Sequence, residues 1–484
     1  MNHRVTITFL ALLVGCGGGS SGPGAAGSPN SSSGTGGLGG AAASAGESAG
    51  IGGTIGPNSA GATAGSAAGA AHGGVGGGAG GGGAGGGAAA GGAAAGGGGQ
   101  AGALGEGGAG GKGGSAADGL GGERAGTGGD IGLPVRASVL ELLHRANAYF
   151  VAKWPDPAKN IDSSHPSHIW TRAVYYEGLL GLYGVDPKPD DLSYAVAWAT
   201  SHAWGLNGGT STRSADDQCA GQTYLDLYLI DPQAPRIKDI KTDIDMVVAG
   251  AAIDDWTWID AIQMAMPVFA KLGATSNQPA YYDKMYAMYS SSKNSQGAAG
   301  FYSETDHLWW RDANYDPPYA EPNGKNCYWS RGNGWVLAAL TRVLDTIPQN
   351  EAHRAEYLAD FKAMAEALRA VQRTDGFWNV SLHDPTHFGG PELTGTSLFT
   401  YGMAWGVRKG ILPAASYQPV IERAWTAMAS SVHQDGFLGY VQGTGQQPSD
   451  GQPVTFDKQP NYEDFGLGCF LLGGSEVARL APPP

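Results

Sequence analysis

The sequence predicts an all-α fold in which six helical hairpins form a closed double ring, the (α/α)6 toroid or barrel, behind a long disordered Gly/Ala-rich N-terminal tether. Two observations predict the rings. Apolar residues recur at three-to-four spacing through eight segments, and Asp-Gly-aromatic turns follow helical segments at Asp375 and Asp435, 60 residues apart. That period accommodates two helices and their connections. The C-terminal part of the chain, about 350 residues long, therefore has room for about six helical hairpins.

The eight helical segments are Val139–Tyr149, Ile169–Tyr183, Leu192–Ala203, Ile259–Leu272, Gly334–Leu344, Tyr357–Gln372, Val420–Val432 and Cys469–Ala478. An open α-solenoid scaffold is the alternative architecture, but its repeats are usually shorter, more regular and poorer in tryptophan. In a closed toroid, the loops at one end form a cleft where polar and aromatic side chains meet.

Composition divides the chain. Most of the 83 glycines lie near the start, and residues 16–132 contain scarcely any large apolar side chain that could offset the entropy cost of folding. We expect this stretch to be a flexible linker. Residues 133–481 contain nearly all the aromatic side chains, enough for one large folded domain.

Residues 1–15 have the features of an export signal. Arg4 precedes a short apolar run, Val5–Val14, and small residues stand before Cys16. This pattern resembles the bacterial lipoprotein signal, in which Cys16 becomes a lipid anchor; the alternative is an ordinary cleaved secretory signal. Both export the domain, and the first anchors it in the bacterial cell envelope, periplasmic or at the cell surface.

Charge and cysteine usage restrict the partners. A net charge of -14 argues against nucleic acid and anionic lipid surfaces, which require an excess of lysine and arginine. The membrane partner is therefore the N-terminal lipid anchor alone. Cys219, Cys327 and Cys469 are spaced too widely for a CxxC metal site, and we expect mostly buried free thiols.

The densest candidate site surrounds Asp260, where an acidic and Trp-rich stretch, 254–264, leads into an apolar helix. Burial beside indoles raises the pKa of a carboxyl group, so that it can act as a general acid. Met264 lies one turn later on the same face. The alternative is that Asp260 only caps the helix or pairs with an arginine.

A second candidate site is the segment 328–335, in which Trp329, Arg331 and Trp335 surround a Gly-Asn-Gly turn. Tryptophans can stack on sugar faces, and a guanidinium can bind a carboxylate at two points. A glycine turn with core tryptophans and a salt-bridged arginine is the structural alternative. A third candidate, Asp216 before an apolar run, supplies a second carboxylate for glycosidic chemistry, or else caps a helix.

Four stretches, 170–178, 215–217, 258–261 and 329–335, resemble in sequence and order the unsaturated rhamnogalacturonyl and unsaturated glucuronyl hydrolases, glycoside hydrolase families 105 and 88. The resemblance extends over about residues 133–480 and implies a six-hairpin α barrel, in agreement with the helical period.

The resemblance assigns roles to individual residues. It implies that Asp260 is the catalytic acid/base and Asp216 the second active-site aspartate. Substrate-binding positions fall on Trp329, Arg331, Trp335, Met264 and Tyr175. Arg311 stands where some members have a histidine and is a further substrate-binding candidate, which would help Arg331 to neutralise the substrate carboxylate. The histidine expected upstream of the acid is absent from 249–255.

The activity implied is removal of a terminal 4,5-unsaturated uronic acid from lyase-generated acidic oligosaccharides. Asp260 protonates C4, water adds to C5, and the product opens to release the aglycone; this chemistry requires no metal or organic cofactor. Two alternatives stay open: an inverting hydrolase or lyase that acts on a saturated acidic glycan, and a surface glycan-binding lipoprotein without turnover.

Overall fold

A computed structural model describes residues 132–162, 165–458 and 464–483. The chain divides into two units, residues 1–116 and 117–484, and every described residue belongs to the second. The predicted tether, the signal and Cys16 lie outside the described residues.

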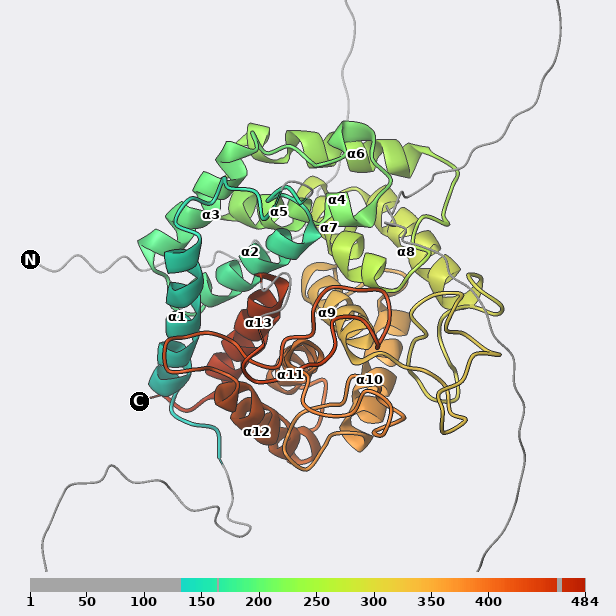
Figure 1. Ribbon diagram of the computed structural model, residues 1–484. Coiled ribbons are helices and arrows are strands. Elements are labelled where there is room, and N and C mark those ends of the chain that lie inside the picture. The colour runs from blue at the N-terminus through green and yellow to red at the C-terminus, as the bar shows by residue number, and fades with distance from the viewer. Residues whose placement is uncertain (1–131, 163–164, 459–463, 484) are drawn as a thin grey trace, which may run out of the picture. The chain divides into compact units, whose positions relative to one another are not determined.

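The described residues form a double ring of α-helices (Figure 1), and their only β-pairings are isolated bridges. The inner ring consists of α2 (Trp170–Tyr183), α5 (Ala220–Ile230), α7 (Asp260–Ser276), α9 (Ser330–Thr346), α11 (Leu393–Arg408) and α13 (Asp464–Leu480). The outer ring consists of α1 (Arg136–Lys153), α3 (Pro189–Ser201), α6 (Lys238–Ala249), α8 (Pro279–Asn294), α10 (Arg354–Ala370) and α12 (Ala414–Ser430). A short helix, α4 (Ala215–Gln218), precedes α5, and two 3₁₀ turns cover Gly209–Ser211 and Ala234–Ile237.

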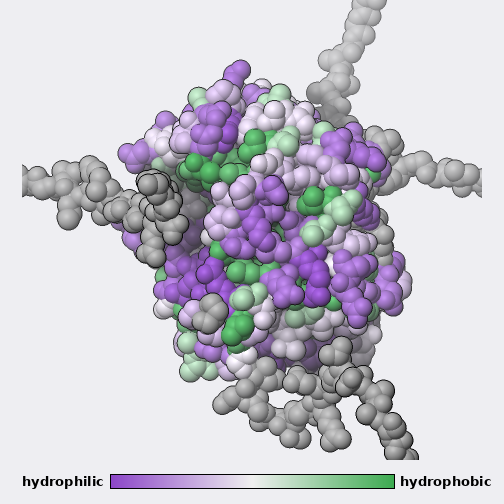
Figure 2. Space-filling model, turned by 90° about the vertical axis from the view of Figure 1, so that its left-hand side faces the viewer, coloured by the Kyte–Doolittle hydropathy of each residue, from purple (hydrophilic) through white to green (hydrophobic). Residues whose placement is uncertain are grey.

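Burial distinguishes the two rings. Every residue of α9 from Ser330 to Leu344 is buried, as is every residue of α13 from Asp464 to Ala478. Outer helices bury one face: in α12 the buried residues include Val420, Ala424 and Met428, at four-residue spacing. The opposite face meets solvent, and the side of the molecule in Figure 2 is mostly hydrophilic, with small separate hydrophobic patches.

The ring closes where α13 packs against α2. A methyl group on Gly178 would lie 2.3 Å from the carbonyl oxygen of Gly468, so the two backbones touch at this crossing. Only glycine permits that approach. The all-α, six-hairpin fold predicted from the sequence is confirmed, and so is the prediction of buried free thiols at Cys219, Cys327 and Cys469.

Pro267 interrupts the hydrogen bonding of α7, because proline has no N–H to donate to the carbonyl of Gln263 one turn earlier. Gln222 of α5 compensates: its side-chain Nε2 donates to the Gln263 carbonyl at 2.6 Å and lies 3.3 Å from that of Met264. The inner ring therefore satisfies this buried carbonyl from a neighbouring helix.

We predict that Gly178→Ala destabilises the domain by at least about 1–3 kcal/mol, because the added methyl group overlaps the backbone of α13. Thermal unfolding followed by circular dichroism measures the loss. Gly181→Ala is the matched control on the same helix, since its methyl group would meet side-chain atoms of Leu472 and Ser475 at 3.4 Å or more. Equal melting temperatures for the two variants would contradict the close crossing.

Candidate active site

The inner helices all begin at the same end of the ring, because one outer helix of opposite direction separates each from the next (Figure 1). Asp260 begins α7, Ser330 begins α9 and Asp464 begins α13. Helix N-termini expose N–H groups and carry partial positive charge. This end of the ring is therefore suited to an anionic ligand.

Asp260 lies at this end and is only 8% exposed. Its Oδ1 is buried and has no hydrogen-bond partner. Gly332 of α9 lies beside the acid, since a methyl group on it would be 3.5 Å from that oxygen. A buried carboxyl oxygen without a partner is unusual and marks Asp260 as a candidate for ligand contact.

Burial raises the pKa of Asp260, and the charges of Arg311 and Arg331 oppose the increase. Burial disfavours the ionised form, whereas nearby cations favour it. The residue can therefore hold a proton in an apolar setting and is sensitive to any change in its cationic neighbours.

Asp216 and Asp217 are adjacent in α4 but differ in environment. Burial, followed by the charges of Asp260 and Asp217, raises the pKa of Asp216 to about 7. Asp217 instead accepts hydrogen bonds from the Thr212 hydroxyl and the Asn207 amide, both at 2.9 Å. Asp216 is thus the member of the pair that interacts electrostatically with Asp260.

Arg311 lies beside Asp260, with its Nε 3.5 Å from Oδ2 of the aspartate. Its Nη1 donates to Asp312, and its carbonyl accepts from the backbone N–H of Ile259 at 3.0 Å. Pairing of Trp258 with Asp312 adds a further link between the two loops. The structure therefore brings Arg311 to the acid, although the two are 51 positions apart in the sequence.

Arg331 is buried, at 1% exposure, and two of its nitrogens are engaged by backbone. Nη1 donates to the carbonyl of Gln442 at 2.9 Å and Nη2 to that of Gly443 at 3.0 Å. The guanidinium lies 4.4 Å from the centre of the Trp329 ring. These contacts tie α9 to the loop before α13. The predicted two-point binding of a substrate carboxylate by Arg331 stays a prediction.

The Arg-Gly-Asn-Gly motif has a different physical role at each position. Asn333 accepts from the backbone N–H of Trp309 at 2.8 Å and donates to the Trp309 and Trp329 carbonyls at 3.0 Å. Gly334 allows α11 to approach, since a methyl group there would lie 2.9 Å from Leu398. The motif therefore fixes the loops around Asp260 and places the glycine at 332 beside it.

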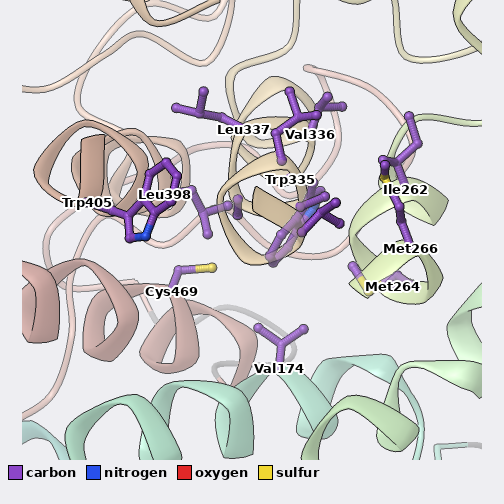
Figure 3. Packing of buried hydrophobic residues seen from close by; sticks show 14 of the residues in the cluster. Val174, Ile262, Met264, Met266, Trp335, Val336, Leu337, Leu398, Trp405 and Cys469 are labelled. Atoms are coloured by element: carbon purple, nitrogen blue, oxygen red, sulfur yellow. The ribbon is translucent and has the colours of Figure 1, made fainter. Parts of the chain in front are cut away.

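The predicted aromatic positions are deeply buried. Trp329 is 1% exposed and donates its Nε1–H to the Gln442 side chain at 2.9 Å. Trp335, also 1% exposed, and Met264 lie in the interior among side chains of neighbouring inner helices, including Val174 and Cys469 (Figure 3). All three belong to the wall and floor of the ring rather than to an open surface.

Tyr175 is not brought to Asp260. Its hydroxyl donates to Asn147 of α1 at 2.8 Å, and its ring packs against Phe150 of the same outer helix at 4.1 Å. The side chain therefore occupies the layer between the rings. The structure gives Tyr175 a packing role against α1, and its predicted substrate contact stays a prediction.

Two residues near the site carry no evident signal in the sequence. Gln442 accepts from Trp329 and holds its own loop by donating to the Asp450 carbonyl at 2.7 Å. His168 has a buried, unpartnered Nδ1, and burial lowers its pKa against the opposing charge of Asp217. Gln442 and His168 are brought near the site residues by the tertiary structure, and no sequence motif marks them.

A cavity of about 560 Å³ lies at the opposite end of the ring, where the inner helices end. Its lining includes Lys271, Arg342 and Arg479, whose positive charges complement the C-terminal ends of helices. None of the predicted site residues lines it. The acids and the tryptophans are at the other end.

The described residues contain neither a grouped set of metal ligands nor a helix suited to a membrane. Within 132–162, 165–458 and 464–483, no three or more His, Cys, Asp or Glu side chains are grouped so that they could hold a metal ion. In the same ranges, no helix combines the length and apolar character needed to cross a bilayer.

We predict that Arg331→Lys lowers the free energy of unfolding by about 1–3 kcal/mol, because an ammonium group cannot replace the guanidinium on both carbonyls. Denaturant titration measures the change. Arg213→Lys is the control: Arg213 forms a partly exposed ion pair with Asp255, so its loss is about 1 kcal/mol or less. A stable Arg331→Lys protein would show that the carbonyl contacts contribute little.

Comparison with known proteins identifies the family. Residues 142–481 match Glycosyl Hydrolase Family 88. An unsaturated 3S-rhamnoglycuronyl hydrolase from Formosa agariphila is 32% identical over 334 residues, covering 64% of this chain and 84% of the relative. A protein of the same name from Alteromonas sp. (strain LOR) is 34% identical over 345 residues, covering 66% and 80%.

A solved structure of a glycosyl hydrolase family 88 protein from Bacteroides vulgatus superposes with a TM-score of 0.65 at 32% identity, covering 72% of this chain and 99% of that one. The resemblance noted in the sequence is therefore confirmed. The chain belongs to Glycosyl Hydrolase Family 88 and is a glycosidase with the (α/α)6 fold.

Proposed function

We propose that this glycosidase removes a terminal 4,5-unsaturated uronic acid from lyase-generated oligosaccharides, of the rhamnogalacturonan type or similar, by hydrating the C4=C5 bond. The observation that carries the proposal is Asp260: a buried acid with an unpartnered oxygen, next to a cation and a second carboxyl group. Both curated relatives are named unsaturated 3S-rhamnoglycuronyl hydrolases, which favours an oligosaccharide that contains rhamnose.

The reaction follows from the chemistry of an enol ether. The C4=C5 bond is conjugated with the ring oxygen, so a proton from Asp260 adds to C4 and leaves an oxocarbenium-like cation at C5. The Asp260 carboxylate then accepts a proton from water as the water oxygen bonds to C5. Asp216 orients that water or stabilises the cation. The resulting hemiketal opens and releases the aglycone, without attack at the anomeric carbon.

We predict that the purified protein removes the ultraviolet absorbance of the conjugated double bond in unsaturated oligosaccharides, and that Asp260→Asn reduces this rate by about 10²–10⁴-fold. The measurement is absorbance over time with lyase products of several polymers. Asp254→Asn, an exposed acid in the same stretch, is the matched control and keeps the wild-type rate.

Two outcomes would overturn the hydration mechanism. One is a constant absorbance together with release of reducing ends from saturated glycans, which would favour an ordinary inverting hydrolase. The other is binding of the oligosaccharides with no turnover by the wild-type protein, which would indicate a glycan-binding role.

The N-terminal sequence supports a proposal about location: the enzyme is exported, lipid-anchored through Cys16, and works in the bacterial cell envelope on acidic oligosaccharides. A short apolar run before a cysteine fits a lipoprotein signal. The Gly-rich stretch that follows would allow the catalytic domain to work at a distance from the lipid.

We predict that the full-length protein expressed in a bacterial host incorporates labelled fatty acid and sediments with membranes, whereas Cys16→Ala incorporates none. Metabolic labelling followed by membrane fractionation makes the measurement. Cys219→Ala is the control, because Cys219 is buried in the folded domain. An unlabelled wild-type protein cleaved near the same position would indicate an ordinary secretory signal instead.

A further inference from the structure

The contact between Arg311 and Asp260 is incomplete. The Nε–Oδ2 distance is 3.5 Å, and neither Nε of Arg311 nor Oδ1 of Asp260 has a hydrogen-bond partner, although both atoms are buried. Buried polar atoms are costly when left unpaired. The geometry is that of a site which is completed when another group enters.

Arg311 has an anchor that does not depend on Asp260. Its Nη1 donates to the Asp312 carboxylate, and Asp312 is itself held by the backbone N–H of Asn314 at 2.8 Å. The guanidinium can therefore keep its position in the cluster while its Nε changes partner.

The other charges around Asp260 are fixed in place or negative. Arg331 of α9 is held by two backbone carbonyls, and Asp216 of α4 and Asp312 of the loop before α9 are carboxyl groups. Arg311 is 14% exposed at its side chain, compared with 1% for Arg331 as a residue. Among these groups, Arg311 is the cation best placed to meet an incoming anion.

The proposed substrate has a matching arrangement. Its carboxylate is attached to C5, two bonds from C4, the atom that takes the proton. A cation that binds the carboxylate must therefore lie close to the acid that protonates C4. Arg311 lies close to Asp260 in this way.

We propose, on the basis of the function above, that Arg311 exchanges partners when substrate binds: it leaves the Asp260 carboxylate for the uronate carboxylate, and Asp260 takes up the proton that it then delivers to C4. In the free enzyme, Arg311 keeps Asp260 available to ionise. In the complex, that cation is shared with the substrate anion, so the charged form of Asp260 loses its stabilising neighbour.

The partner exchange predicts how activity depends on pH. A general acid is active below its pKa, so activity falls as pH rises through the pKa of Asp260. The alkaline fall of kcat/KM reports the free enzyme and that of kcat reports the complex. Because Arg311 lowers the pKa of Asp260 in the free enzyme, the fall of kcat is expected at a higher pH, by about one unit or more.

The test is the pH dependence of both constants with an unsaturated disaccharide, for the wild type, Arg311→Gln and Arg213→Gln. Arg311→Gln is expected to move the fall of kcat/KM to higher pH and to raise KM at least tenfold. Arg213, paired with Asp255, is the control, and Arg213→Gln keeps the wild-type profiles. Coincident alkaline falls in the wild type would overturn the exchange while leaving the hydration reaction intact.

A second measurement tests the partner exchange independently of the hydration reaction. It also shows whether Asp260 or Asp216 takes up the proton. Calorimetry in buffers of different ionisation enthalpy measures the protons taken up when methyl glucuronoside, a saturated uronate that does not react, binds to the enzyme. Uptake by the wild type that is lost in both Asp260→Asn and Arg311→Gln supports the exchange, even for a protein that hydrates no unsaturated substrate. Uptake that persists in Asp260→Asn assigns the proton to Asp216 and overturns it.

Discussion

Six inner helices surround one axis, and each is buried on nearly all sides, so the close approach of their backbones is the constraint on which the rest of the structure depends. Glycines occur where neighbours cross. A methyl group on Gly473 would lie 2.6 Å from the Ser397 carbonyl oxygen, and one on Gly402 would lie 2.8 Å from Leu337. Gly395 is likewise closed in by Ser330 at the start of α9. Small residues thus set the width of the ring, and the width sets the space left at its open end.

Because the inner ring is closely packed, a polar group inside it costs free energy unless it has a hydrogen-bond partner. Glu177 is completely buried, and it is retained because Gln263 donates to it at 2.9 Å and the Cys219 thiol at 3.4 Å. Lys271 and Arg342 surround the adjoining carboxylate of Asp226. All four carboxylate oxygens of Glu177 and Asp226 therefore have partners, which stabilise one arrangement of the helices. At the other end, Asp260 differs because one of its oxygens is not satisfied.

The sequence predicted the ring of hairpins well because its signal is a simple period. It placed the start of the helix at Ile259, one residue before the observed α7, and it found Asp216 and Asp260 at helix starts. It missed α6 and α8, whose charged and tyrosine-rich faces dilute the apolar pattern, and α11, which is rich in threonine and glycine. The position of Tyr175 shows a limit of the sequence: nearly all of α2 is buried, so spacing cannot tell the face toward the axis from the face toward α1, where the Tyr175 hydroxyl bonds to Asn147.

The two arginines show a second limit. Arg331 stands in a specific motif, whereas Arg311 stands alone among aromatic residues, so the sequence analysis assigned carboxylate binding first to Arg331 and only second to Arg311. The carbonyls that engage Arg331 come from Gln442 and Gly443, more than a hundred positions later, in a stretch of Gln and Gly without a local pattern. Only tertiary contacts reveal which guanidinium is committed to the fold.

The competition between burial and positive charge explains how one residue can serve as acid and then as base. A helix N-terminus stabilises a carboxylate by about 0.3–1 kcal/mol, rising to about 2 kcal/mol in favourable buried geometries, whereas complete burial can shift a pKa by several units. For Asp260, burial outweighs the helix start and two nearby arginines, and its pKa is raised. Asp217 shows the contrasting environment three residues before α5, where two hydrogen bonds hold its carboxylate oxygens. Asp260 instead has a buried oxygen without a partner, and burial raises its pKa. The competition between burial and positive charge suits a hydration, because the same carboxyl group must give a proton to carbon and then accept one from water within a single turnover.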